Sequence, residues 1–146
     1  MTRSELREFL ASGVNALTPP PVFASGLYTF FNSNRDWEYP IVFQETAPVG
    51  TEYLQTGAPV DSWEVVLWVA KLTKVDAVPD DYEPLIDDCD LIAQKLIYQY
   101  RVKIAGYKNA SITSAQREPF VKKNADCLAG VTIRFTVVSS NTENLC

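Results

Sequence analysis

The sequence predicts one α+β domain with a mixed or mainly antiparallel sheet, on which an N-terminal helix and one long amphipathic helix pack. A chain of 146 residues has the length of one ordinary domain. Two segments carry apolar residues at three- and four-residue steps, and four others are rich in β-branched and aromatic residues. The expected order within the single domain 1–146 is helix, strand, strand, loop, strand, helix, strand.

The N-terminal helix is predicted over residues 2–17. Its apolar residues fall on one stripe, and its charged residues lie off that stripe. Thr2 and Glu5 have the spacing of a capping box, in which two side chains satisfy two backbone N–H groups. The helix is expected to end before the prolines 19–21, because proline lacks the N–H that a helix needs.

Strands and a loop are predicted to follow. The segments at about 22–31 and 39–45 have strand composition and are joined by a polar turn. The segment 46–61 contains two prolines and two glycines, which indicate a long loop, a loosely held ribbon or an arm. The nearly continuous apolar run 62–72 predicts a central strand that is covered on both faces.

The clearest helix is predicted over residues 81–103, where apolar residues recur at three- and four-residue steps. Acidic residues lie at its start and basic residues at its end, which is the favourable arrangement for a helix dipole. These residues are Asp80, Asp81 and Glu83 at the start, and Arg101 and Lys103 at the end.

The C-terminal third is predicted to hold an arm, a strand and a tail. The polar segment 107–127 carries several basic residues and is expected to form a basic arm. Apolar and polar residues alternate over 128–138, which predicts a strand with one buried face. The tail 139–146, which ends in Cys146, is expected to be flexible.

The residue inventory disfavours most enzyme chemistry. The chain has no histidine, which excludes Ser-His-Asp and Cys-His nucleophile pairs and removes the commonest zinc ligand. No glycine-rich phosphate-binding motif occurs. None of Cys89, Cys127 and Cys146 has a C-x-x-C spacing. We therefore expect no catalytic residue, cofactor or metal, and no enzyme activity.

The ends and the overall charge also bear on partners. The N-terminus lacks the apolar core of a signal peptide, and no segment approaches a membrane-spanning length. We therefore expect a protein made in the cytosol, without a membrane partner. A pI near 4.7 makes general binding to nucleic acid unfavourable, so any contact with DNA would be local.

The element order and several segments resemble the tail-terminator or tail-completion proteins of tailed bacteriophages. The segments are the N-terminal helix, "WEYPIVFQE" at 37–45, "WEVVLWV" at 63–69, the helix 81–103 and "LAGVTIRFTVV" at 128–138. The resemblance implies a small virion subunit, assembled in the host cytoplasm. It implies a ring, a hexamer or larger, at the head-proximal end of the tail, which caps the tube or joins it to the neck. The implied partners are copies of the chain itself, the tail tube, and neck or portal-adjacent proteins.

Acidic and basic residues are separated along the chain, whose net charge is -5. Residues 76–90 contain seven acidic residues and no Lys or Arg, whereas residues 101–123 contain six basic residues and one acidic residue. A head-to-tail ring needs two complementary surfaces on each subunit, and opposite charges set register and encounter rate. We therefore expect the acidic block of one subunit to face the basic segment of its neighbour.

The expected interface includes one aromatic residue, Trp37, because it lies in a polar turn and tryptophan is enriched at binding hot spots. The candidate interface residues are Asp80, Asp81, Glu83, Asp87, Asp88, Arg117, Lys122, Lys123 and Trp37. Two alternatives remain for the charges. In the first, both blocks are solvated faces without a partner, since exposed ion pairs contribute about 0–1 kcal/mol. In the second, the basic arm lines a lumen through which genomic DNA passes.

Two alternatives also remain for the function. One is another head-completion, neck or tail-ring protein of the virion. The other is a small cytosolic enzyme that uses carboxylates such as Asp87, Asp88 and Asp90. These carboxylates are better explained by the exposed face and the dipole-matched start of a helix.

Overall fold

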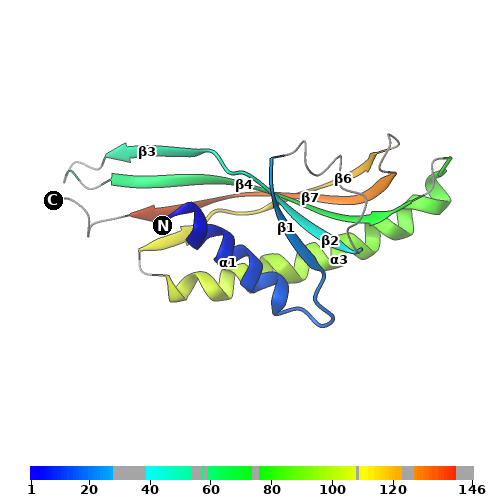
Figure 1. Ribbon diagram of the computed structural model, residues 1–146, viewed down its shortest axis with the longest axis horizontal. Coiled ribbons are helices and arrows are strands. Elements are labelled where there is room, and N and C mark those ends of the chain that lie inside the picture. Colours follow the sequence, from blue (N-terminus) through cyan, green and yellow to red (C-terminus); the bar gives the residue numbers. More distant parts are fainter. Residues whose placement is uncertain are drawn as a thin grey trace.

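Two α-helices pack on one face of a seven-stranded mixed sheet in the described part of the chain (Figure 1). The computed structural model describes residues 1–27, 39–53, 57, 59–73, 76–107, 109–122 and 127–140. The elements are α1 (Arg3–Asn15), β1 (Val22–Gly26), β2 (Ile41–Glu45), β3 (Val49–Tyr53), β4 (Pro59–Leu72), α3 (Pro79–Lys103), the 3-10 helix η1 (Ile104–Gly106), β5 (Ala110–Ile112), β6 (Gln116–Lys122) and β7 (Leu128–Ser140). The predicted α+β class is confirmed.

The sheet is built around one long antiparallel pair, β4 with β7. The other edge of β4 pairs with β3 near its start and with β2 near its end. The other edge of β7 pairs with β6 near its start and with β5 near its end. Strand β1 lies parallel to β2 and completes the sheet. The carboxyl ends of β1 and β2 therefore meet at the same edge, beside the start of α1 (Figure 1).

Helix α1 forms for the reasons its sequence indicates. The capping box is present: the Glu5 backbone N–H donates to Oγ1 of Thr2, and the Thr2 N–H donates to Oε2 of Glu5, both at 3.1 Å. The stripe of Leu6, Phe9, Leu10 and Val14 is buried against α3 and the sheet. The helix ends at Asn15, ahead of the prolines.

Helix α3 begins at Pro79, two residues earlier than predicted, and ends at Lys103 as predicted. The carboxylate of Asp81 caps its start by accepting the Val78 N–H at 3.2 Å. Cys89, Ala93 and Leu96 are among the residues that form its buried face. The two helices thus form one layer over the sheet.

The main core lies between the helices and alternate residues of β4 and β7. A second, smaller cluster of Ile41, Phe43, Ala70 and Leu128 lies on the opposite face of the sheet. The expectation that residues 62–72 are covered on both faces holds near Ala70 but not near Glu64, which is exposed. Coverage is therefore uneven along β4, because this second cluster lies only near one end of the strand.

Segments expected to be irregular contain edge strands. The segment 46–61, expected as a loop, ribbon or arm, includes β3 paired with the first residues of β4, so it is a ribbon where it is described. The segment 107–127, expected as a basic arm, includes β5 and β6. Of the tail expected over 139–146, residues 139 and 140 belong to β7, and residues 141–146 lie outside the described residues. These strands form because they pair with the long strands β4 and β7. Edge strands exposed to water show little apolar alternation, so their sequence does not identify them as strands.

Candidate functional site

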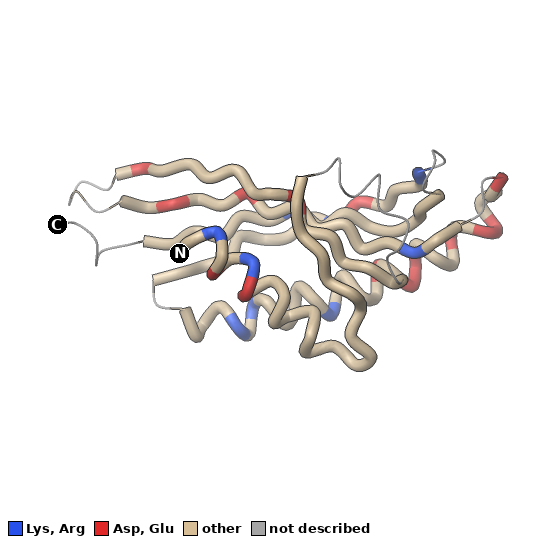
Figure 2. The backbone as a smooth tube through the Cα atoms, viewed as in Figure 1, with Lys and Arg blue, Asp and Glu red and all other residues tan. Residues whose placement is uncertain are grey.

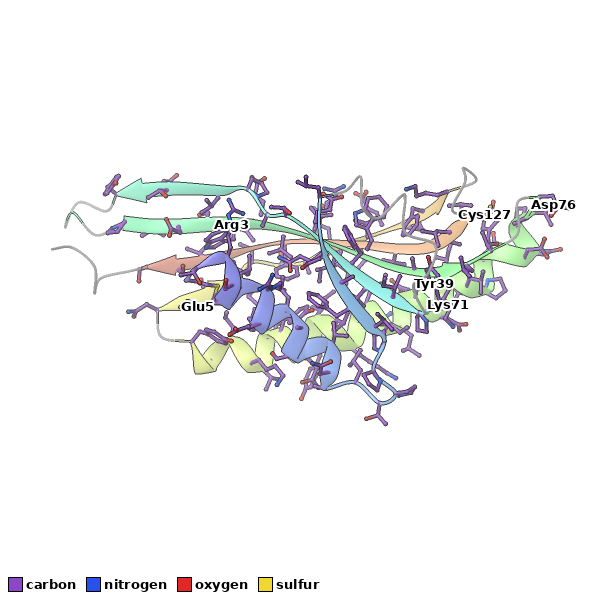
Figure 3. All side chains as sticks on the ribbon, viewed as in Figure 1. Arg3, Glu5, Tyr39, Lys71, Asp76 and Cys127 are labelled. Carbon is purple, nitrogen blue, oxygen red and sulfur yellow. The ribbon has the colours of Figure 1, made fainter. Side chains whose placement is uncertain are left out.

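The start of α3 is an acidic surface. Figure 2 shows acidic positions gathered along the first turns of this helix, and Figure 3 places Asp76 at the adjoining tip of the molecule. Asp80, Asp81, Glu83 and Asp87 are exposed there. Asp81 is occupied in capping the helix, whereas the described residues give the carboxylates of Asp80 and Glu83 no ion pair. These two charges face solvent in the single chain.

The rest of the acidic block meets basic residues of the same chain. Nη1 of Arg117 lies 2.7 Å from Oδ2 of Asp90, and Nζ of Lys71 lies 3.2 Å from Oδ2 of Asp88. Arg117 stands opposite Ile133 in the register of β6 and β7, so it points to the face that α3 covers. The expected pairing of acidic block with basic segment is therefore found, for Arg117, within one chain.

The other candidate residues are placed differently. Lys122 ends β6 on the opposite face of the sheet, where its Nζ lies 6.0 Å from the centroid of the Trp68 ring. Trp68 packs edge-on against Phe120, with ring centroids 4.8 Å apart. Trp37 and Lys123 lie outside the described residues. The structure thus brings the acidic candidate residues together at the start of α3, but Lys122 lies apart from them on the other face of the sheet.

A pocket of about 240 Å³ lies between the start of α1 and the carboxyl ends of β1 and β2. It combines guanidinium, hydroxyl and amide groups, and no described Asp or Glu lines it. The lining residues are Arg3, Ser4, Leu6, Arg7, Ser25, Gly26, Gln44, Thr46 and Ala47. The positive end of the α1 dipole adds to this charge, since Arg3 and Ser4 are its first two residues. The pocket is therefore suited to a negatively charged group.

The two arginines of the pocket have different settings. Nη1 of Arg3 donates to the Ala47 carbonyl oxygen, and the Arg3 guanidinium lies 5.1 Å from the centroid of the Trp63 ring. Arg3 is thus held in place, with donors left over because a guanidinium carries five N–H groups. Arg7, one turn further along α1, is exposed and has no ion pair or hydrogen bond with any described residue.

Gln44 supplies the buried polar group of this pocket. Its side chain is only 5% exposed, and its Oε1 accepts no hydrogen bond from any described residue. In the sheet register Gln44 pairs with Leu67, whose side chain belongs to the core under the helices, so Gln44 points toward α1. A buried acceptor without a donor costs about 1–3 kcal/mol. The position therefore favours a donor supplied from outside the chain.

Sequence reasoning missed this pocket, although two signals were present. Arg3 and Arg7 stand four residues apart on the polar side of the predicted helix. Gln44 interrupts the apolar run of residues 41–43 at a position that faces the core. Neither signal predicts the pocket alone, because its walls come from segments about 20–40 residues apart in the sequence.

The buried titratable groups do not form a reactive centre. Burial raises the pKa of the Cys89 thiol to about 12, which keeps it protonated at neutral pH. Burial also raises the pKa of Tyr100, whose hydroxyl donates to the Leu10 carbonyl oxygen at 2.9 Å. Both groups therefore serve packing.

The described residues hold neither a candidate metal centre nor a membrane-spanning helix. No group of three or more Cys, Asp and Glu side chains there is arranged to hold a metal ion. Within the same ranges, no helix combines the length and apolar character needed to cross a membrane. No protein-family model matches the sequence, and no curated protein matches it.

Proposed function

We propose that the protein is a structural subunit of a phage virion that assembles into a ring, as a tail terminator does, and caps the tail tube or joins it to the neck. The proposal starts from the resemblance of its elements to that class of protein. It assigns the chain no reaction.

The observation that carries the proposal is the separation of charge in space. Acidic residues gather at the start of α3 and basic residues at its end, while the start of α1 carries charges of both signs (Figure 2). Of the charged residues of that helix start, Arg3 and Arg7 line the pocket beside the sheet. A closed ring of head-to-tail contacts places one surface of each subunit against a different surface of the next. Opposite charges on the two surfaces steer that encounter and suppress other registers.

Strand β3 gives the assembly a second contact element. All five residues of Val49–Tyr53 are exposed, and β4 is the one described strand that pairs with β3. An edge strand with free N–H and C=O groups pairs readily with another chain. Tyr53, which is 74% exposed, adds an aromatic side chain at this edge.

Native mass spectrometry and negative-stain electron microscopy of the purified chain test the proposal. We expect a closed ring, a hexamer or larger, that loosens as the salt concentration rises because exposed charges are screened. A chain that stays monomeric at its highest soluble concentration contradicts the proposal.

The position in the virion needs a separate measurement. Tail tubes can be assembled from a purified phage tube protein, and the purified ring can then be added during assembly. A terminator is expected to bind one tube end and stop further growth. A ring that leaves tube length unchanged and binds a neck protein instead points to a head-completion or neck role.

A further inference from the structure

The pocket at the start of α1 has the properties of a receiving site for an acidic peptide segment. We infer that it binds the acidic start of α3 from a second copy of the chain, with Asp80 as the entering residue. This inference rests on the proposed ring, and it identifies the surfaces that meet in that ring. It also replaces the basic segment 101–123 as the expected partner of the acidic block.

The positive groups of the pocket suit a carboxylate. Arg7 has no described partner, and Arg3 is held by Ala47 and Trp63 with donors still available. Guanidinium and carboxylate groups form paired, charge-assisted hydrogen bonds. Hydroxyl groups of Ser4, Ser25 and Thr46 line the same pocket and can donate as well.

Gln44 favours a ligand that brings a hydrogen-bond donor together with its negative charge. Its Oε1 is an acceptor without a donor, so the missing partner must carry an N–H or O–H group. An isolated carboxylate supplies oxygen acceptors alone, whereas inorganic phosphate at neutral pH still carries an O–H and is therefore included in the test below. A peptide segment with an acidic side chain supplies a backbone N–H together with the negative charge. It can pair with the exposed Arg7 directly, and with Gln44 once the buried amide turns toward the pocket.

At the start of α3, one residue offers both a carboxylate and a backbone N–H. Asp80 is exposed, and its carboxylate has no described ion pair. The N–H groups of Asp81 and Tyr82 already donate to the Val78 carbonyl oxygen, whereas the Asp80 N–H has no such acceptor in the described residues. An N–H group in the first turn of a helix has no intrahelical acceptor and needs one from outside.

The shape of the molecule requires that the contact be made between copies. Figure 3 places Arg3 at the start of α1 and Asp76 at the far tip beyond the start of α3. The acidic tip therefore cannot reach the pocket of its own chain. The start of α3 extends well beyond α1 to the opposite end of the molecule (Figure 1), where it is free to enter the pocket of a neighbour.

A charge-swap experiment tests the contact. Ring formation is measured by analytical ultracentrifugation at near-physiological salt for the wild-type chain, Arg7→Glu, Asp80→Lys and the double variant. Each single variant places like charges at the contact, so we expect the dissociation constant of the ring to rise at least tenfold. The double variant restores opposite charges and is expected to recover most of the assembly. Circular dichroism checks that each variant is folded.

Arg101→Glu is the matched control. It makes the same change of charge at an exposed residue in the last turn of α3, within the basic segment that the sequence first suggested as partner. We expect it to leave the ring unchanged. If Arg101→Glu disrupts the ring as strongly as Arg7→Glu does, the effect is one of net charge, and the inference is overturned.

The remaining outcomes separate this inference from the proposed function. A ring that persists in both single variants, or that the double variant fails to restore, overturns the inference and leaves the ring itself established. A wild-type chain that never assembles overturns both. Inorganic phosphate serves as a competitor: if it binds to the wild-type pocket, loses binding in Arg7→Glu and leaves assembly unaffected, the pocket is a phosphate site instead.

Discussion

Gly13 of α1 lies directly against the aromatic ring of Tyr100 on α3, so closely that a Cβ atom at Gly13 would overlap the Tyr100 ring. The Tyr100 hydroxyl donates to the carbonyl oxygen of Leu10, at 2.9 Å, on the same helix as Gly13. The Tyr100 ring also lies 5.3 Å from Phe9 and 5.7 Å from Phe135, centroid to centroid. One side chain thus joins α1, α3 and β7, and the absence of a side chain at Gly13 makes this possible.

We predict that Gly13→Ala destabilises the protein by about 1–3 kcal/mol, the usual effect of forcing an added group into a packed core. The sign is informative, because alanine in a helix is otherwise favoured over glycine by about 1 kcal/mol. Urea unfolding measures the change. Gly106→Ala is the control: a Cβ there meets no atom within 4 Å, so we expect a change within about 0.5 kcal/mol. A stabilised Gly13→Ala variant would contradict the packing.

We predict that Cys89 makes the stability fall at alkaline pH. Burial raises the pKa of its thiol from 9.0 to about 12, against a smaller lowering by Lys71. The unfolded chain therefore loses this proton first as the pH rises. The contribution is fully present below about pH 9 and is lost as the pH rises from 9 toward 12.

Urea unfolding of the wild type and of Cys89→Ala between pH 8 and pH 11 measures this effect. The difference in unfolding free energy between them is expected to be constant up to about pH 9 and to shrink above it, because only the wild type carries the titrating thiol. Tyr100, whose pKa is also raised, contributes equally to both chains and cancels in the difference. A difference that stays constant across the range would mean that Cys89 is hydrated in the folded protein.

We predict that the ion pair of Arg117 and Asp90 stabilises the single chain slightly and has no part in assembly. The two side chains are about one third exposed, at 36% and 35%, so a double-mutant cycle with alanine is expected to give a coupling of about 0.2–1 kcal/mol. Ring formation by Arg117→Ala should match that of the wild type. If instead Arg117→Ala disperses the ring, the basic segment faces a neighbouring subunit as the sequence first suggested.

The helices could be predicted from the sequence, whereas the edge strands could not. Helices α1 and α3 have apolar stripes and local capping or charge signals in their own sequence. All four of their ends lie within two residues of the expected bounds. Strand β6 contains Pro119 and four exposed residues, and β3 is exposed throughout. These two strands form because β4 and β7 are long enough to pair with them, and the local sequence of an edge strand does not indicate the length of its partner.

Part of the candidate site could likewise be predicted from the sequence, and part could not. The acidic start of α3 is contiguous in the sequence, so composition alone identified it. Arg7 and Gln44 belong to segments that meet only when α1 packs on the sheet, and this contact is set by the core around Gly13. The sequence places the acidic block and the basic segment on two subunits, whereas Arg117 pairs with Asp90 within one chain. Charges separated along a sequence do not show whether β6 folds back beside α3.

Gln44→Met gives the most discriminating result for the pocket. The variant removes a buried acceptor that lacks a donor, so we predict that the isolated subunit becomes more stable by about 1 kcal/mol. The same variant removes the group that an incoming N–H would satisfy, so ring formation should weaken. A residue that serves only the fold would not move the two quantities in opposite directions.

Urea unfolding at a concentration where the subunit is monomeric measures the first quantity, and ultracentrifugation measures the second. Gln116→Met is the matched control, because Gln116 is exposed on β6 and both quantities should stay within error. Should Gln44→Met lower the stability of the monomer, Oε1 has a donor such as a bound water in the free subunit. In that case Gln44 belongs to the fold alone, and the attraction between subunits rests on the charges of Arg7 and Asp80.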